Sequence, residues 1–226
     1  MIFGTIREFL VTEDGGLTTP GYIVCIVAAV LALGLAIFIS KKKKKEGMDA
    51  RVLVFCGVSV ALAYVLSFVK VIPLPFGGSV TLCSMLFVCI VGYWYGLGTG
   101  MLVAFVYGML QFLQSPYILS FFQICCDYLL AFACLGLTGL FHGKKNGLII
   151  GYLIAVMARG AFHSLGGYLF WMEYMPDNFP VALAWAYPIV YNYMYILAEA
   201  AITIILLLLP PVKKGISQIT KLARGE

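Results

Sequence analysis

The side chains in this chain that could bind a flat ring are concentrated in one stretch of its second half. His163, Gly167 and Trp171 recur at steps of four residues, so on a helix they would share one face. The small glycine would leave room between an imidazole and an indole. After a turn, a second helical segment carries Tyr187 and Asn192, whose hydroxyl and amide could face the same space. This spacing predicts a slot for a planar ligand.

The elements that must position these side chains are membrane helices. Of the 226 residues, 62% are hydrophobic and 11% are charged, whereas about a quarter of a soluble globular domain is charged. We therefore expect an all-α integral membrane protein, a six-helix transmembrane bundle plus one extra N-terminal transmembrane helix. The predicted domains are residues 1–46, the N-terminal extension, and residues 47–226, the six-helix domain. The apolar segments run over residues 21–40, 50–70, 80–95, 97–114, 118–141, 147–171 and 181–211.

Basic residues cluster at alternate ends of these segments. Lys41 to Lys45 follow the first segment, Lys144 and Lys145 lie in a short loop, and the C-terminal tail is also basic. The positive-inside rule then predicts a multi-pass cell-membrane protein with its N-terminus outside and its C-terminus in the cytoplasm. The net charge of +5 is explained by this topology, so we expect no nucleic-acid partner. The lysine run could also bind anionic lipid.

Polar groups at membrane depth indicate a binding site. At helical rise, Asp127 and His163 would each lie about 12 Å from the outer end of their helices, and Tyr187 and Asn192 bracket that depth. Taken alone, His163 could be an interhelical hydrogen-bond former and Trp171 an interfacial aromatic. Their coincidence at one level favours a joint site, because intramembrane ionisable residues are costly.

The groups of this site define its ligand. Aromatic faces and a carboxylate attract a cation, whereas Asn and His can hydrogen-bond to ring nitrogens and an exocyclic amine. A small, cationic, aromatic ligand fits best. Deeper in the membrane, Arg159 and Glu199 are expected to form a structural ion pair. The seven cysteines show no metal-ligand spacing, so we expect no metal, no disulfide framework and no cofactor other than the ligand.

Several motifs from Arg51 to Pro211 occur in a characteristic order. They read SVTL after FGG, YWYGLGTG, PYILSFFQICCDYLLAF, ARGAFHSLGGYLFW and YPIVYN. In this combination the chain resembles the thiamine-specific substrate-binding subunit, or S-component, of energy-coupling factor vitamin transporters. The resemblance implies a six-helix bundle with a thiamine pocket near the outer face, closed by the loop between its first two helices.

The resemblance also implies residue roles. The implied thiamine contacts are Tyr117, Asp127, Tyr128, His163, Gly167, Trp171, Tyr187 and Asn192. The implied partner interface consists of Gly57, Ser59, Ala61 and Ala63, which form small-xxx-small pairs. The implied partners are a transmembrane scaffold subunit and two ATPase subunits, and the transport step is toppling of the bundle.

We therefore expect a subunit that captures thiamine outside the cell and imports it with an ATP-driven module. The sequence has no GxxxxGK[ST] phosphate loop, so the energy is expected to come from other subunits. Alternatives are a subunit for another flat vitamin, a self-sufficient permease, an intramembrane enzyme using Asp127 and His163 as acid and base, and a purely structural membrane protein.

Overall fold

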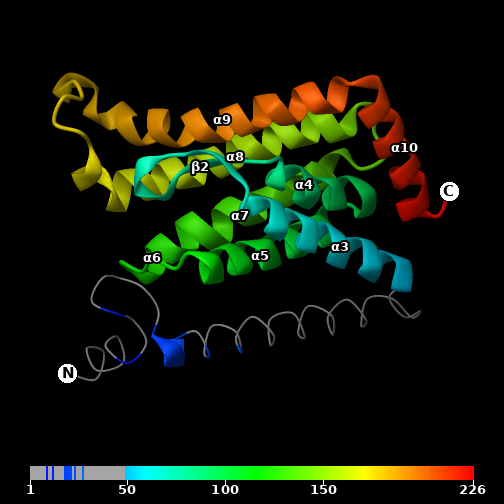
Figure 1. The fold of residues 1–226 in the computed structure, drawn as a ribbon, viewed down its shortest axis with the longest axis horizontal. Helices are drawn as coiled ribbons and strands as arrows, with labels where there is room; N and C mark the ends of the chain where they lie inside the picture. The colour runs from blue at the N-terminus through cyan, green and yellow to red at the C-terminus, as the bar shows by residue number, and fades with distance from the viewer. Residues whose placement is uncertain (1–8, 10–11, 13–17, 22, 24–26, 28–48) are drawn as a thin grey trace.

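The structure is a computed structural model that describes residues 9, 12, 18–21, 23, 27 and 49–226. The predicted helix at 21–40, the run Lys41 to Lys45 and the extension 1–46 therefore fall outside the described residues, apart from isolated positions. From residue 50 onward the chain forms long helices that lie side by side (Figure 1).

Within the described part of the chain, five segments are long and apolar enough to cross a membrane. They are α3 (Ala50–Ser67), α5 (Leu97–Gln114), the composite segment Phe121–Phe141, α8 (Gly147–Phe170) and the segment Val181–Leu208, most of which is α9 (Tyr187–Leu208). The composite segment contains α6 (Phe121–Ile124), η2 (Cys125–Leu130), α7 (Ala131–Ala133) and η3 (Cys134–Phe141). The chain is thus a mostly helical, multi-pass membrane protein.

The apolar segment predicted at 80–95 forms a shorter helix than expected. Its first residues belong to β2 (Ser79–Thr81), which pairs antiparallel with β1 (Lys70–Pro73) around the short turn η1 (Pro75–Gly77). Only α4 (Ser84–Tyr95), with 12 residues, is helical. At 1.5 Å per residue α4 extends about 18 Å, which is less than the ~30 Å hydrocarbon core. The connection between α3 and α4 is thus a β-hairpin.

Helix α4 forms the centre of the bundle. Met85, Val88 and Cys89 have no exposed surface, and α4 packs against α3, α5, η3 and α8. Two glycines in η3 allow the backbones to meet closely: a Cβ at Gly136 or Gly139 would lie 2.4 Å from a backbone nitrogen of α5. This close packing holds η3 directly against α5.

The two ends of α9 differ from the continuous helix predicted at 181–211. Residues Val181–Ala186 form the tight turn η5, and a further short turn, η4 (Met172–Tyr174), follows α8. At the other end, Pro210 and Pro211 follow Leu209, which is extended, and start a separate amphipathic helix, α10 (Pro210–Arg224). Proline favours the first turn of a helix but disrupts a helix interior. Figure 1 shows α10 turning across the end of the bundle.

Candidate functional site: a cavity beneath the hairpin

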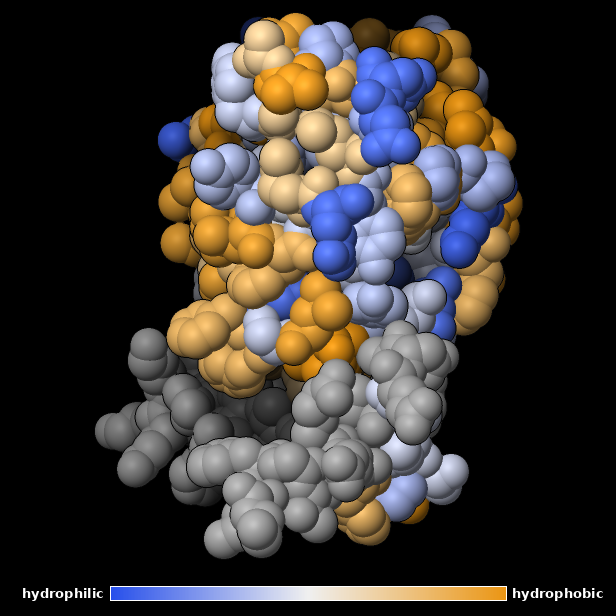
Figure 2. Space-filling view, turned by 90° about the vertical axis from the view of Figure 1, so that its left-hand side faces the viewer, coloured by the Kyte–Doolittle hydropathy of each residue, from blue (hydrophilic) through white to orange (hydrophobic). Residues whose placement is uncertain are grey.

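A cavity of about 530 Å³ lies beneath the β1–β2 hairpin, between α5, η2, α8 and α9. Its volume is in the usual range for small-molecule sites, about 300–1,000 Å³. The eight residues predicted to contact a ligand all line this cavity: Tyr117, Asp127, Tyr128, His163, Gly167, Trp171, Tyr187 and Asn192. Figure 2 faces this end of the molecule, where hydrophilic and hydrophobic surface are mixed.

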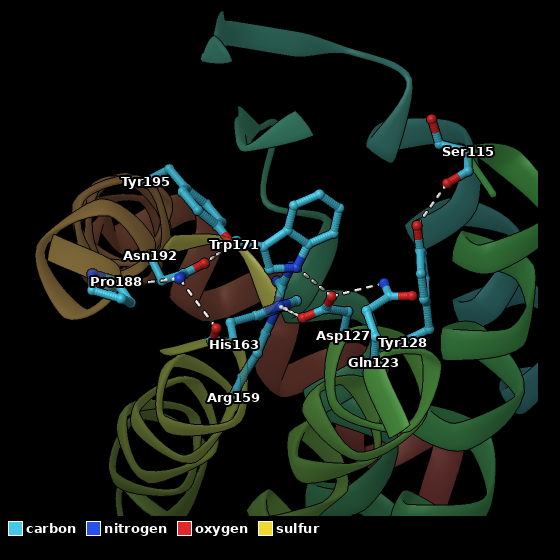
Figure 3. Close-up of polar contacts among 10 residues, drawn as sticks. All are labelled: Ser115, Gln123, Asp127, Tyr128, Arg159, His163, Trp171, Pro188, Asn192 and Tyr195. Atoms are coloured by element: carbon cyan, nitrogen blue, oxygen red, sulfur yellow. Dashed lines mark hydrogen bonds and ion pairs between the residues drawn. The ribbon is translucent and has the colours of Figure 1, made fainter. Parts of the chain in front are cut away.

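Asp127 is, with Glu199, one of two acidic residues that line the cavity. Its Oδ2 accepts hydrogen bonds from Trp171 Nε1 at 3.0 Å and from Gln123 Nε2 at 2.8 Å. Its Oδ1 lies 3.8 Å from Nδ1 of His163, and the two side chains are only 14% and 12% exposed. Figure 3 shows the carboxylate between these three partners. A carboxylate oriented by donors and shielded from water is suited to hold a cation.

The backbone around Asp127 is π-helical over Cys125–Leu130. Asp127 and its neighbour Tyr128 both line the cavity, and the Tyr128 hydroxyl donates to Ser115 O at 2.8 Å. Single π-helical turns within α-helices often occur at functional sites. Gly166 of α8 lets the carboxylate approach closely, because a Cβ there would lie 2.5 Å from Asp127 Oδ1. Neither the π-helical turn nor this role of Gly166 was predicted from the sequence.

His163 is oriented by Arg159. The guanidinium Nε donates to His163 Nε2 at 3.3 Å, and Arg159 Cζ lies 4.4 Å from the centroid of the Phe132 ring. Since Nε2 accepts this bond, a neutral imidazole carries its proton on Nδ1, the nitrogen that faces Asp127. The side chains of Asp127, His163 and Arg159 thus form one chain of polar contacts along the cavity wall.

The predicted ion pair between Arg159 and Glu199 is wrong: both residues are described, and no N···O contact within 4.0 Å joins them. Glu199 is 3% exposed and instead accepts from Thr81 N at 3.0 Å, Thr81 Oγ1 at 2.6 Å, Met85 N at 3.2 Å and Ser84 Oγ at 3.3 Å. These donors satisfy the buried carboxylate, so it needs no cation. Glu199 thereby joins α9 to the hairpin base and to the start of α4.

Gly167 and Asn192 connect α8 with α9. A Cβ at Gly167 would lie 2.9 Å from Pro188 Cβ and 3.2 Å from Asn192 Nδ2. Asn192 Nδ2 donates to Pro188 O at 2.8 Å and to His163 O at 3.2 Å, and its Oδ1 accepts from Tyr195 at 2.9 Å. Gly167 lines the cavity, and its missing side chain also lets α9 approach α8 closely. Of the Asn192 amide, only the second lone pair of Oδ1 remains for a ligand.

Aromatic rings form the mouth of the cavity. The Trp171 ring centroid lies 5.0 Å from that of Tyr117 and 5.5 Å from that of Tyr174, and Phe76 of the hairpin lies 5.1 Å from Tyr174. Tyr187 donates to Tyr174 O at 3.1 Å. The hydroxyls of Tyr117 and Tyr174 are 3.3 Å apart, and this hydrogen bond raises the pKa of Tyr174. These rings give a cationic heterocycle faces to contact.

The hairpin is fastened to α9 by Tyr191. Its hydroxyl accepts from Gly78 N at 3.1 Å and donates to Pro75 O. Phe76, between these contacts, has a φ of 62°, a left-handed conformation that is uncommon outside glycine. Sequence analysis missed Tyr191 and Tyr195, although their step of four after Tyr187 was a readable signal for one helical face.

The model of the family described as "Thiamine transporter protein (Thia_YuaJ)" matches residues 53–218. The chain belongs to this thiamine transporter family. The resemblance inferred from the sequence motifs is thereby confirmed, and the chain is a transporter-family member rather than an enzyme.

Two relatives agree with the family. The chain is 28% identical to the thiamine transporter ThiT of Bacillus subtilis (strain 168) over 178 residues, which cover 70% of this chain and 88% of that protein. A solved structure of ThiT from Listeria monocytogenes superposes with a TM-score of 0.57 at 27% identity, covering 71% of this chain and 94% of that one. The fold is therefore ThiT-like.

The small residues predicted to contact a partner lie on two different faces of α3. Gly57 and Ala61 are exposed, and a Cβ at Gly57 would meet nothing within 4 Å. Ser59 is 3% exposed and Ala63 is 0% exposed, and Ala63 O accepts from Tyr107 of α5. Ser59 and Ala63 thus pack inside the protein's own bundle, which argues against a direct partner contact for these two.

Proposed function

We propose that this chain is the substrate-binding subunit that captures thiamine at the outer face of the cell membrane and imports it together with an ATP-driven energy-coupling module. In this proposal residues 47–226 form the six-helix thiamine-binding domain, with α4 as its short central helix. Residues 1–46 add one further transmembrane helix. The N-terminus is outside and the C-terminus is cytoplasmic, because the basic loops would then share the inner side.

The observation that carries the proposal is the arrangement around Asp127. Thiamine joins a cationic thiazolium ring to an aminopyrimidine, so it needs a counter-charge, aromatic faces and hydrogen-bonding groups together. Asp127 lines the cavity beside Trp171 and His163. A partly buried carboxylate attracts the cation more strongly than an exposed one because the local dielectric is low. Tyr117, which packs against Trp171, supplies a second aromatic face.

The proposed ligand contacts are unequal. Asp127, His163, Trp171, Tyr117 and Tyr187 present rings or polar atoms to the cavity and are proposed as direct contacts. Tyr128, Gly167 and Asn192 line the cavity too, but their known contacts are to the protein itself. We assign these three mainly to shaping the site.

The proposed partners are a transmembrane scaffold and two ATPase subunits, which contact this chain through the exposed Gly57 and Ala61. Small residues allow close helix approach in a membrane, where packing and not the hydrophobic effect drives association. The transport step in this proposal is toppling of the bundle within the assembled complex.

The deciding test is equilibrium binding of thiamine to the purified chain in detergent, with riboflavin and biotin as controls. Saturable binding of thiamine alone supports the proposal, whereas binding of another vitamin in its place contradicts the assigned ligand. Uptake into proteoliposomes then separates subunit from permease. Uptake that requires the ATPase module and ATP is expected, and uptake by the isolated chain would make it a self-sufficient permease.

A further inference from the structure

A second hollow lies at the opposite end of the bundle from the thiamine cavity. It has a volume of about 660 Å³ and is bounded by the start of α8, the end of α9 and α10. Its wall is mainly apolar, with Leu148 and Ile149 from α8, Leu207 and Leu208 from α9, and Ile216 from α10. An apolar wall of this kind suits a hydrocarbon chain and offers nothing to a free inorganic anion.

The edge of the same hollow is cationic. Lys213, Ser217 and Lys221 line it and follow one another at steps of four, so they form one stripe along α10. Helix α8 begins beside them at Gly147 without a side-chain cap, and uncapped helix N-termini attract anions through their free amides. Glu226 is an acidic residue on this edge, so two lysines stand against one acidic side chain.

Helix α10 has the form of a helix at a membrane surface. Trp94 of α4 donates to Thr220 Oγ1 at 2.9 Å, and Arg224 donates to Tyr93 O at 2.8 Å. These contacts hold one face of α10 against the bundle. Ile219 and Leu222 stay exposed on α10, while Lys213 and Lys221 line the hollow. An amphipathic helix with exposed leucine-type residues and basic residues typically lies in the bilayer interface.

We propose that this hollow binds an anionic phospholipid, with an acyl chain along the α8–α9 wall and the phosphate between Lys213 and Lys221. The cationic edge is complementary to the phosphate of such a lipid, and the apolar wall is complementary to its acyl chain. The exposed Leu208 and Leu209 continue the apolar wall towards the surrounding acyl chains. The site is separate from the thiamine cavity and does not depend on the function proposed for that cavity.

The test measures lipid binding to the full chain in mixed micelles at low ionic strength, where exposed charges are least screened. Phosphatidylglycerol is the probe, and phosphatidylcholine and inorganic phosphate are the comparison arms. We expect saturable binding of phosphatidylglycerol and no comparable binding in the other two arms. Equal binding of phosphatidylcholine, or of inorganic phosphate alone, would overturn the proposal.

Matched variants locate the site. The double variant Lys213→Gln/Lys221→Gln should bind phosphatidylglycerol roughly 30-fold more weakly, since each basic residue near a lipid surface contributes roughly fivefold. The control Lys145→Gln/Lys214→Gln removes the same charge from lysines that do not line the hollow and should bind nearly as the wild type does. The melting temperature checks that every variant is folded. Equal loss in both double variants would show a non-specific charge effect and refute a defined site.

Discussion

The indole Nε1 of Trp171, at the end of α8, donates a hydrogen bond to Oδ2 of Asp127 over 3.0 Å. This bond joins the end of α8 to the π-helical turn. It couples the indole ring and the carboxylate, the two groups that a cationic aromatic ligand would contact. The indole therefore has two roles in the proposed site: its ring is a face of the cavity mouth, and its N–H orients the carboxylate.

These two roles can be separated with Trp171→Phe, which keeps an aromatic face and removes the N–H. We expect thiamine affinity to fall about 10-fold to 100-fold, the range for one hydrogen bond to a charged group. Trp171→Ala should lose more, because the ring is also removed. Isothermal titration calorimetry measures both. Trp185→Phe is the control, because Trp185 is exposed and does not line the cavity. Unchanged thiamine affinity in Trp171→Phe would show that the indole N–H does not contribute to binding.

Gly166 is expected to be as important for binding as the residues that touch the ligand. In Gly166→Ala the new Cβ would lie 2.5 Å from Asp127 Oδ1, so the carboxylate must move. Overpacking of this kind costs about 1–3 kcal/mol, and we expect at least about a fivefold loss of thiamine affinity. Gly98→Ala is a matched control, since a Cβ at Gly98 meets nothing within 4 Å. Equal affinities in the two variants would contradict the requirement for close approach.

Gln123 is a further positioning residue. It is 1% exposed, donates to Asp127 and accepts from Leu119 N at 3.2 Å. Gln123→Leu should weaken thiamine binding about tenfold, because Asp127 loses one of its orienting donors. Gln218→Leu, at an exposed position on α10, serves as the control. A variant that folds and binds like the wild type would show that Trp171 alone is sufficient to orient the carboxylate.

Much of this site was predictable because its signals are local. Steps of four residues placed His163 and Trp171 together, and depth along a helix brought Asp127 to the same level. The membrane class followed from composition alone. The motifs in their order then indicated the family, which the family model confirms.

What could not be predicted depends on contacts between elements. Arg159 and Glu199 are opposite charges at similar depth, yet Glu199 finds its donors on the hairpin and α4, and no spacing along the chain encodes that choice. Gly166 and Gly167 are adjacent and identical in type, and only the packing shows that one faces Asp127 and the other faces α9. The hairpin strands were missed because Val80 and Thr81 run directly into the apolar stretch that forms α4, so they were assigned to the start of that segment.

Glu199 is expected to stabilise the fold more than a surface carboxylate would. Glu199→Ala leaves the backbone amides of Thr81 and Met85 without their acceptor in the buried interior, and each unsatisfied donor costs about 1–3 kcal/mol. The melting temperature should fall markedly, and Glu199→Gln should recover part of the loss because its amide oxygen still accepts. Glu173→Ala, in the turn after α8, is the comparison. A melting temperature unchanged in Glu199→Ala would show that the donors find water instead.

Ala61 and Ala63 are two positions apart on α3 but lie on different faces of the helix, so we expect opposite effects when each is enlarged. Ala63 has no exposed surface, so Ala63→Leu should overpack the bundle, cost about 1–3 kcal/mol of stability and lower thiamine binding with it. Ala61 is exposed, so Ala61→Leu should leave melting temperature and thiamine affinity unchanged but reduce co-purification with the scaffold and ATP-dependent uptake. Thermal unfolding, binding and uptake are measured on both variants. Normal uptake by Ala61→Leu would place the partner contact on another face of the bundle, while normal stability of Ala63→Leu would contradict the packing of α3 against α5.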